Sequence, residues 1–252
     1  MKIRLIAAQI GAALLFALGS EAQAAEIKVL SSNAVKSVLE ELAPQFEKAT
    51  KNKIAFTFDT AAALKSQIEK GAAFDLAVLT DAGIDDLVKL GKISGESRAA
   101  LARSSAGVAI KKGAARPDIS TTDAFKRTLL AAKSIGFVEQ GATGSYLKGL
   151  FQRLGIADEL KPKLKMLAAE VGAGGAVSSG DVEIGLTQIA EILPYAGAEL
   201  LGPLPTEIQL NTDFTAGVGA MAKESDGAKA LIKFLATPAA VAVIKAKGLV
   251  PR

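Results

Sequence analysis

Three turns of small polar residues, each between an apolar run and a helix-like run, carry the chemistry that this sequence offers. They are residues 31–35, 59–64 and 142–146. Small side chains let a ligand approach the backbone, and the free N–H groups and positive dipole end of a helix start favour carboxylates and oxyanions. Helix capping alone explains one such turn. Three in one chain favour an anion-binding site.

We expect these turns and two cations to hold the anion. Lys36 lies in the first turn of a helix, where a cation is unfavourable unless an anion sits in front of it. Arg103 could grip a carboxylate through two hydrogen bonds. A solvated lysine and a surface arginine are the alternatives. The predicted ligand-binding residues are Ser32, Asn33, Ala34, Lys36, Thr60, Ala61, Ala62, Arg103, Thr143, Gly144 and Ser145.

The composition narrows the possible chemistry. The chain has no cysteine and no histidine, which removes disulfides, zinc–cysteine sites, the commonest metal ligand and the commonest general base. We therefore expect no metal site and no cofactor, and binding rather than catalysis. The net charge of +4 is spread along the chain, so we do not expect nucleic acid as a partner.

Strand-like and helix-like runs alternate from Glu26 onward, which predicts an α/β fold. Pro44 interrupts the first helical pattern and predicts a bend or break near residues 42–43. Residues 108–110 predict the beginning of a new strand. Two segments, 102–109 and 211–219, have the character of crossings between lobes.

These crossings divide the chain into two lobes. Residues 25–104 and 214–252 are expected to form lobe I, and residues 105–213 lobe II. Residues 1–24 have a basic start, a short apolar stretch and a small-residue ending, so they predict a signal peptide that is cleaved before Ala25 and a periplasmic location. A membrane anchor is the alternative, but the apolar stretch is short for a span.

Several motifs, in order and spacing, resemble the molybdate-binding family of periplasmic solute-binding proteins, which have the two-lobed type II fold. They include the turn Ser31-Ser32-Asn33, the strand after Phe74-Asp75, and the turn Gly144-Ser145-Tyr146. The resemblance covers nearly all of residues 25–252. It implies that each lobe is a mixed sheet flanked by helices, that two hinge strands cross between the lobes, and that the ligand lies in the cleft.

The sequence also departs from the molybdate pattern. The second turn is poorer in hydroxyl groups, and Thr187-Gln188 stands where the family has a tyrosine; the resemblance therefore makes Gln188 a further ligand-binding residue. Two motifs, at residues 115–120 and 202–205, resemble a sub-branch that includes aconitate isomerase. The molybdate pattern does not need the charged candidates Lys36 and Arg103, and we expect a cationic site with an amide donor to suit an organic carboxylate at least as well as an oxyanion.

The resemblance implies a periplasmic protein that delivers a small anion to the membrane permease of an ABC transporter. We expect a monomer, because the sequence shows no exposed apolar stripe. The alternative is a cofactor-independent isomerase of an unsaturated tricarboxylic acid. That reaction needs a base in the cleft, and the candidates are Lys36, Asp59, Glu139 and Tyr146.

Overall fold

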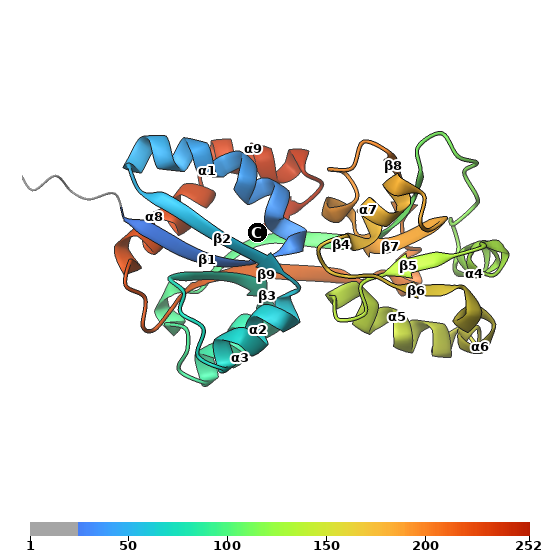
Figure 1. Cartoon of the computed structure of the whole chain (residues 1–252), viewed down its shortest axis with the longest axis horizontal. Coiled ribbons are helices and arrows are strands. Elements are labelled where there is room, and N and C mark those ends of the chain that lie inside the picture. Colours follow the sequence, from blue (N-terminus) through green and yellow to red (C-terminus); the bar gives the residue numbers. More distant parts are fainter. Residues whose placement is uncertain (1–24) are drawn as a thin grey trace, which may run out of the picture.

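The computed structural model describes residues 25–252, so the predicted signal peptide lies outside the described residues. Two α/β lobes lie side by side and are joined by long strands that cross between them (Figure 1). The predicted α/β class and two-lobed architecture are confirmed.

Lobe I is built on a mixed sheet. Its centre is β1 (Glu26–Ser32), which pairs in parallel with β2 (Lys53–Asp59) and β3 (Leu76–Thr80). The antiparallel strand β9 (Asn211–Val218) follows β3. The helices of this lobe are α1 (Lys36–Thr50), α2 (Ala61–Glu69), α3 (Asp81–Lys89), α8 (Ser225–Leu235) and α9 (Pro238–Ala246).

Lobe II is also a mixed sheet. Strand β7 (Ile184–Gln188) pairs in parallel with β5 (Ile135–Phe137), which continues to β6 (Leu164–Met166). Strand β8 (Ala198–Pro203) lies at the side of the sheet opposite β6. The helices are α4 (Thr122–Ala131), α5 (Ala142–Arg153), α6 (Ala157–Leu160) and α7 (Gly172–Ser179), and short 3-10 turns η1 (Asn33–Val35) and η4 (Ile189–Glu191) lie one in each lobe.

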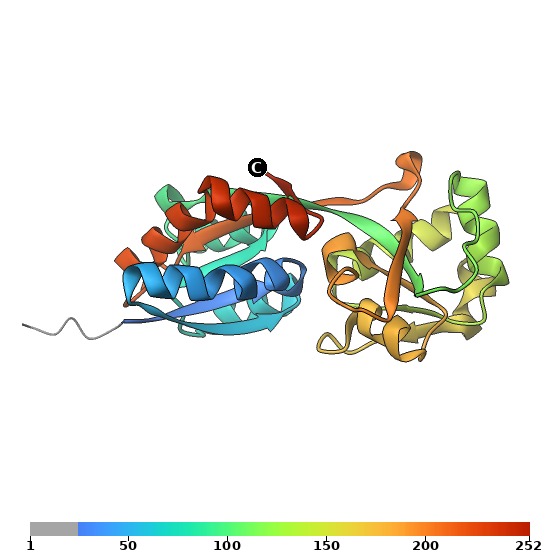
Figure 2. The ribbon, with the colours of Figure 1, turned by 90° about the horizontal axis from the view of Figure 1, so that it is seen from above.

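One strand, β4 (Ala99–Lys111), belongs to both sheets. It pairs with β9 as far as Ser105, and from Ala106 onward it pairs with β7. Figure 2 shows β4 and the chain entering β9 passing together from one lobe to the other. The sequence predicted a crossing between lobes over residues 102–109 and a strand from residue 108. It did not predict that the strand begins at Ala99, because alanine and serine in the first half of β4 have little strand propensity. Pairing with β9 overrides that weak local preference.

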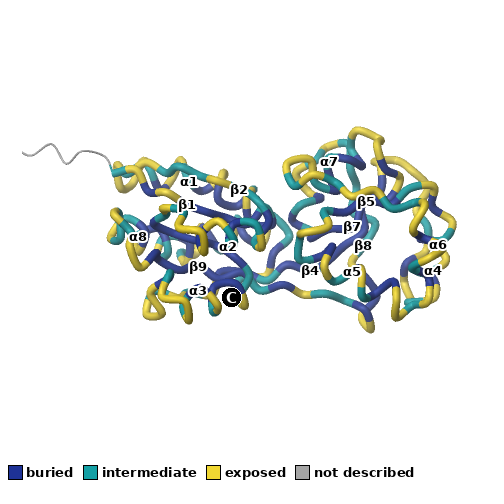
Figure 3. Tube along the Cα trace, turned by 60° about the horizontal axis from the view of Figure 1, so that its bottom comes forward, coloured by how far each residue is buried: buried dark blue, intermediate teal, exposed yellow. Residues whose placement is uncertain are grey.

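The first helix, α1, packs its apolar side against the core, and Pro44 does not break it. The helix α1 buries Val38, Leu39, Leu42 and Phe46 against the lobe I sheet, and Figure 3 shows buried segments running through both lobes. The predicted break near residues 42–43 is wrong, since α1 is continuous from Lys36 to Thr50. Pro44 lies on the exposed face, where water can bond the carbonyl that loses its helical partner.

Among the described residues, no single helix has the length and apolar character needed to cross a membrane, although α8 and α9 together meet both measures as a pair bent by 69°.

Candidate functional site

A cavity of about 380 Å³ lies between the lobes. Lobe I lines it with the turn after β1, the start of α2 and part of β9; lobe II lines it with the start of α5, the segment before α7, and the end of β7 with η4. Nine of the twelve predicted ligand-binding residues line it: Ser32, Asn33, Ala34, Lys36, Thr60, Ala61, Thr143, Gly144 and Gln188. Residues far apart in the chain therefore meet at one site.

The turn after β1 forms one wall of the cavity. The backbone N–H of Ala34 donates to the Ser32 hydroxyl at 3.4 Å, which caps the following turn. The side-chain amide of Asn33 reaches across the cleft and donates to the carbonyl of Ala169 at 3.2 Å. Asn33 therefore joins lobe I to the lobe II segment that precedes α7.

The helix α2 starts at the same wall. The Thr60 hydroxyl accepts a hydrogen bond from the N–H of Ala63 at 3.2 Å. The N–H groups of the first helical residues have no carbonyl partner within a helix. Because Thr60 and Ala61 both line the cavity, this helix start presents its donors and its positive dipole end to whatever fills the cleft.

The helix α5 starts opposite, in lobe II. Residues 141–144 line the cavity, and Thr143 and Gly144 are buried. A Cβ at position 144 would overlap the carbonyl oxygen of Val138. Glycine therefore allows α5 to begin close to the end of β5, with its first N–H groups at the cleft.

Gln188 lines the cavity, but its side-chain amide hydrogen-bonds to other residues of the protein. Its amide nitrogen donates to the hydroxyls of Thr143, at 2.9 Å, and Thr212, at 3.2 Å. Both amide protons are thereby used, so this side chain offers a ligand no free donor in this arrangement. It ties the start of α5 to β7 and to the crossing strand β9.

Among the described residues that line the cavity, Lys36 is the one cation. Three glutamates, Glu40, Glu170 and Glu191, also line it. The Lys36 ammonium lies 3.8 Å from Glu40 and 5.4 Å from the centre of the Phe58 ring. The cationic site expected from Lys36 and Arg103 is not formed, because Arg103 does not line the cavity.

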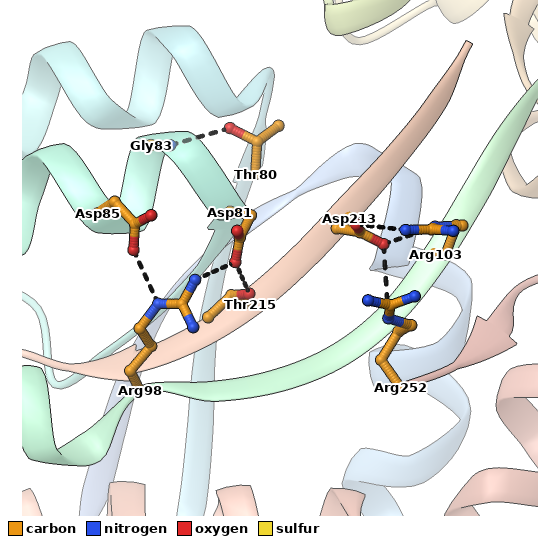
Figure 4. A network of polar contacts seen from close by, with 9 residues as sticks. All are labelled: Thr80, Asp81, Gly83, Asp85, Arg98, Arg103, Asp213, Thr215 and Arg252. Atoms are coloured by element: carbon orange, nitrogen blue, oxygen red, sulfur yellow. Dashed lines mark hydrogen bonds and ion pairs between the residues drawn. The ribbon is translucent and has the colours of Figure 1, made fainter.

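Arg103 lies on the hinge and is not part of the cavity lining. Its guanidinium donates two hydrogen bonds to Asp213, at 2.8 and 2.7 Å, directly across the β4–β9 pair (Figure 4). Asp213 also lies 3.8 Å from Arg252. The Arg103 guanidinium holds the pKa of Asp213 below its usual range. The bidentate grip predicted for Arg103 exists, but its partner is a protein carboxylate 110 residues away.

Two other predicted ligand-binding residues, Ala62 and Ser145, are exposed and also lie outside the cavity lining. Among the candidate bases, Lys36 alone lines the cavity. The Tyr146 hydroxyl donates to the carbonyl of Ile208 at 2.9 Å, and Glu139 pairs with Lys148 at 2.6 Å. Asp59 accepts from the N–H of Thr60 at 2.6 Å.

Glu191 was not predicted from the sequence. It lines the cavity, and its carboxyl accepts a hydrogen bond from the Thr187 hydroxyl and another from the N–H of Gln188 at 3.4 Å. Burial raises the pKa of Glu191, and the two hydrogen bonds oppose that effect. The signal was the spacing of Gln188 and Glu191, which is that of a capping box after a strand.

Comparisons with known proteins agree with this arrangement. The chain is 31% identical over 231 residues to an aconitate isomerase of Pseudomonas sp, covering 89% of this chain and 87% of that protein. It is 26% identical over 244 residues to the molybdate-binding protein ModA of Escherichia coli (strain K12), covering 94% and 95%. The periplasmic molybdate-binding protein of Azotobacter vinelandii has the same fold, with a TM-score of 0.75, 22% identity, and coverage of 89% of this chain and 98% of that one.

A family model described as bacterial extracellular solute-binding protein matches residues 27–250. Since that match spans nearly the whole described chain, this protein belongs to the family of bacterial extracellular solute-binding proteins.

Proposed function

We propose that this protein binds a small anion, most favourably an organic carboxylate, in the cavity between its lobes. The observation that carries the proposal is the meeting of helix starts from both lobes at one cavity, where Thr60, Ala61, Thr143 and Gly144 all line the walls. Helix N-termini bind carboxylates and oxyanions through N–H groups and the dipole.

The size of the cavity favours an organic acid over a tetrahedral oxyanion. An oxyanion displaces roughly four or five waters, or about 150 Å³ at about 30 Å³ per water. The cavity of about 380 Å³ has room for more than twice that volume. With Lys36 as the lining cation and glutamates around it, neutral backbone donors must do most of the binding.

Export and delivery complete the proposal. The predicted signal peptide at residues 1–24 would carry the protein to the periplasm, where cleavage precedes Ala25. There, as a monomer, it would deliver the anion to the permease of an ABC transporter. The family assignment to extracellular solute-binding proteins supports this role.

Thermal unfolding of residues 25–252 with a panel of anions tests the proposal. The panel contains citrate, cis- and trans-aconitate, molybdate, tungstate, sulfate and phosphate. Ligand at about 100 times its Kd adds about 2.7 kcal/mol, which raises Tm by about 5–10 °C at this size. We expect this shift with the tricarboxylates. A shift with molybdate and tungstate alone would contradict the carboxylate preference, and no shift with any anion would contradict anion binding.

A matched pair of cap variants locates the site. Thr60 and Thr121 both cap helices, accepting from backbone N–H groups at 3.2 and 3.1 Å, but only Thr60 lines the cavity. Each Thr→Val change should cost about 1 kcal/mol of stability. Only Thr60→Val should also reduce the shift caused by the anion. Equal losses in both variants would place the ligand elsewhere.

A second candidate function is the isomerisation of an unsaturated tricarboxylate. The relative that is 31% identical is named for that reaction on aconitate, and Glu191 supplies a carboxyl in the cavity. A base would take a proton from the methylene carbon, the double bond would shift, and the same group would return the proton to the former vinyl carbon. Proton NMR of cis-aconitate mixed with the protein would reveal trans-aconitate, and Glu191→Gln should abolish its formation.

A further inference from the structure

We propose that Glu191 binds the anion as a neutral carboxylic acid, donating its O–H to an anion oxygen, so that the protein takes up a proton with its ligand. This inference rests on the proposed function, because it assigns a role at the same cavity. It identifies a donor that the helix starts and Lys36 do not supply.

The two oxygens of Glu191 have different surroundings. Oε2 accepts from the Thr187 hydroxyl and from the N–H of Gln188. Within residues 25–252, Oε1 has no hydrogen-bond partner. The described side-chain oxygens that are both buried and unpartnered do not include it, so Oε1 is accessible. Since Glu191 lines the cavity, Oε1 is the oxygen available to a ligand.

The backbone holds this carboxyl firmly at the cavity. Glu191 is the last residue of η4, directly after β7, and the bond from the N–H of Gln188 closes the turn. On the other side η4 packs against α7, where a Cβ at Gly174 would overlap the carbonyl oxygen of Glu191. Glycine at that position lets η4 approach α7 closely.

Among the described residues, no lysine or arginine forms an ion pair with Glu191. Helix α7 has no titratable residue, and the preceding segment contributes Glu170. Beside η4, Tyr195 has its pKa raised by burial and then by Glu191. Arg103 of β4 is paired with Asp213, and Lys247, beyond α9, is paired with Glu41.

The remaining charged groups of the cavity also leave Glu191 without a partner. Lys36 of α1 lies beside Glu40 of the same helix. Burial raises the pKa of Glu191, which favours its neutral form. An ionised Glu191 would repel an anion, whereas a neutral one donates a hydrogen bond to it, so the ligand raises the pKa further and retains the proton.

Two isothermal titration measurements on residues 25–252 with trans-aconitate test the inference. In buffers of different ionisation enthalpy, wild type should take up close to one proton per anion above the pKa of free Glu191. Over the same range its Kd should rise by up to about tenfold per pH unit, as expected for one linked proton. A Kd that does not change with pH, with no proton uptake, would overturn the inference while leaving anion binding intact.

The variant Glu191→Gln gives the sharper result. Its amide keeps an acceptor for Thr187 and a donor for the ligand, but it does not titrate in this range. We expect no proton uptake, a Kd independent of pH, and tighter binding than wild type above the pKa of free Glu191. Weaker binding than wild type at every pH would overturn the inference.

Glu170→Gln is the matched control, because it removes another carboxylate of the same cavity. It should retain the proton uptake and pH dependence of wild type. Loss of the pH dependence in this variant would assign the proton to Glu170 and overturn the inference. Absence of binding in wild type at every pH would instead refute the proposed function, and the role of Glu191 with it.

Discussion

The hydrogen bond from Asn33 to the carbonyl of Ala169 predicts a latch between the lobes. It spans the cleft at 3.2 Å and is partly buried. A hydrogen bond of this kind contributes about 0.5–1.5 kcal/mol, so Asn33→Ala should reduce the ratio of closed to open molecules by about two- to thirteenfold. If the closed form binds the anion, the apparent affinity falls by up to the same factor.

Small-angle X-ray scattering of the unliganded protein isolates the latch from any ligand contact by Asn33. We expect a larger radius of gyration for Asn33→Ala than for wild type, and a weaker Kd in titrations with trans-aconitate. Asn52→Ala is the control, since Asn52 lies just beyond the C-terminal end of α1, outside the cavity lining. A weaker Kd with unchanged scattering would show that Asn33 acts as a ligand contact and would refute the latch.

Three further predictions concern the supports of the cavity. Gly144→Ala should cost about 1–3 kcal/mol through overlap with the Val138 carbonyl, lowering both Tm and affinity for the anion. Gly174→Ala should move η4 and have a similar cost, measured by urea unfolding. Arg103 lowers the pKa of Asp213, so the pair stabilises the fold above about pH 4 and loses that effect as the pH falls through the lowered value. Asp213→Asn should therefore lose less stability than wild type between about pH 5 and about pH 2, and an equal loss would contradict this reasoning.

Local patterns were sufficient to predict the alternation of strands and helices and the turns of the site. Each strand-to-helix turn carries its own signal, as Thr60 does by capping α2. The start of β4 at Ala99 and the continuity of α1 through Pro44 depend on tertiary packing, which outweighs local propensity. Sequence reasoning therefore missed both.

The site was harder to predict where residues pair over long distances. Nothing near Arg103 in the sequence shows that Asp213 lies opposite it, 110 residues later. Gln188 was predicted to face the ligand, but the threonines that engage its amide come from α5 and β9. Glu191 resembles an ordinary capping residue in the sequence, and only the fold shows that it lines the cavity.

The central claim is that an anion binds to the helix starts of both lobes. Amide chemical shifts followed by ¹H–¹⁵N NMR during titration of residues 25–252 with trans-aconitate test it most directly. The account predicts the largest shifts at the N–H groups of Ala61, Thr143 and Gly144, saturating together. Saturable shifts that are confined to one lobe, or that leave these amides unchanged, would contradict it.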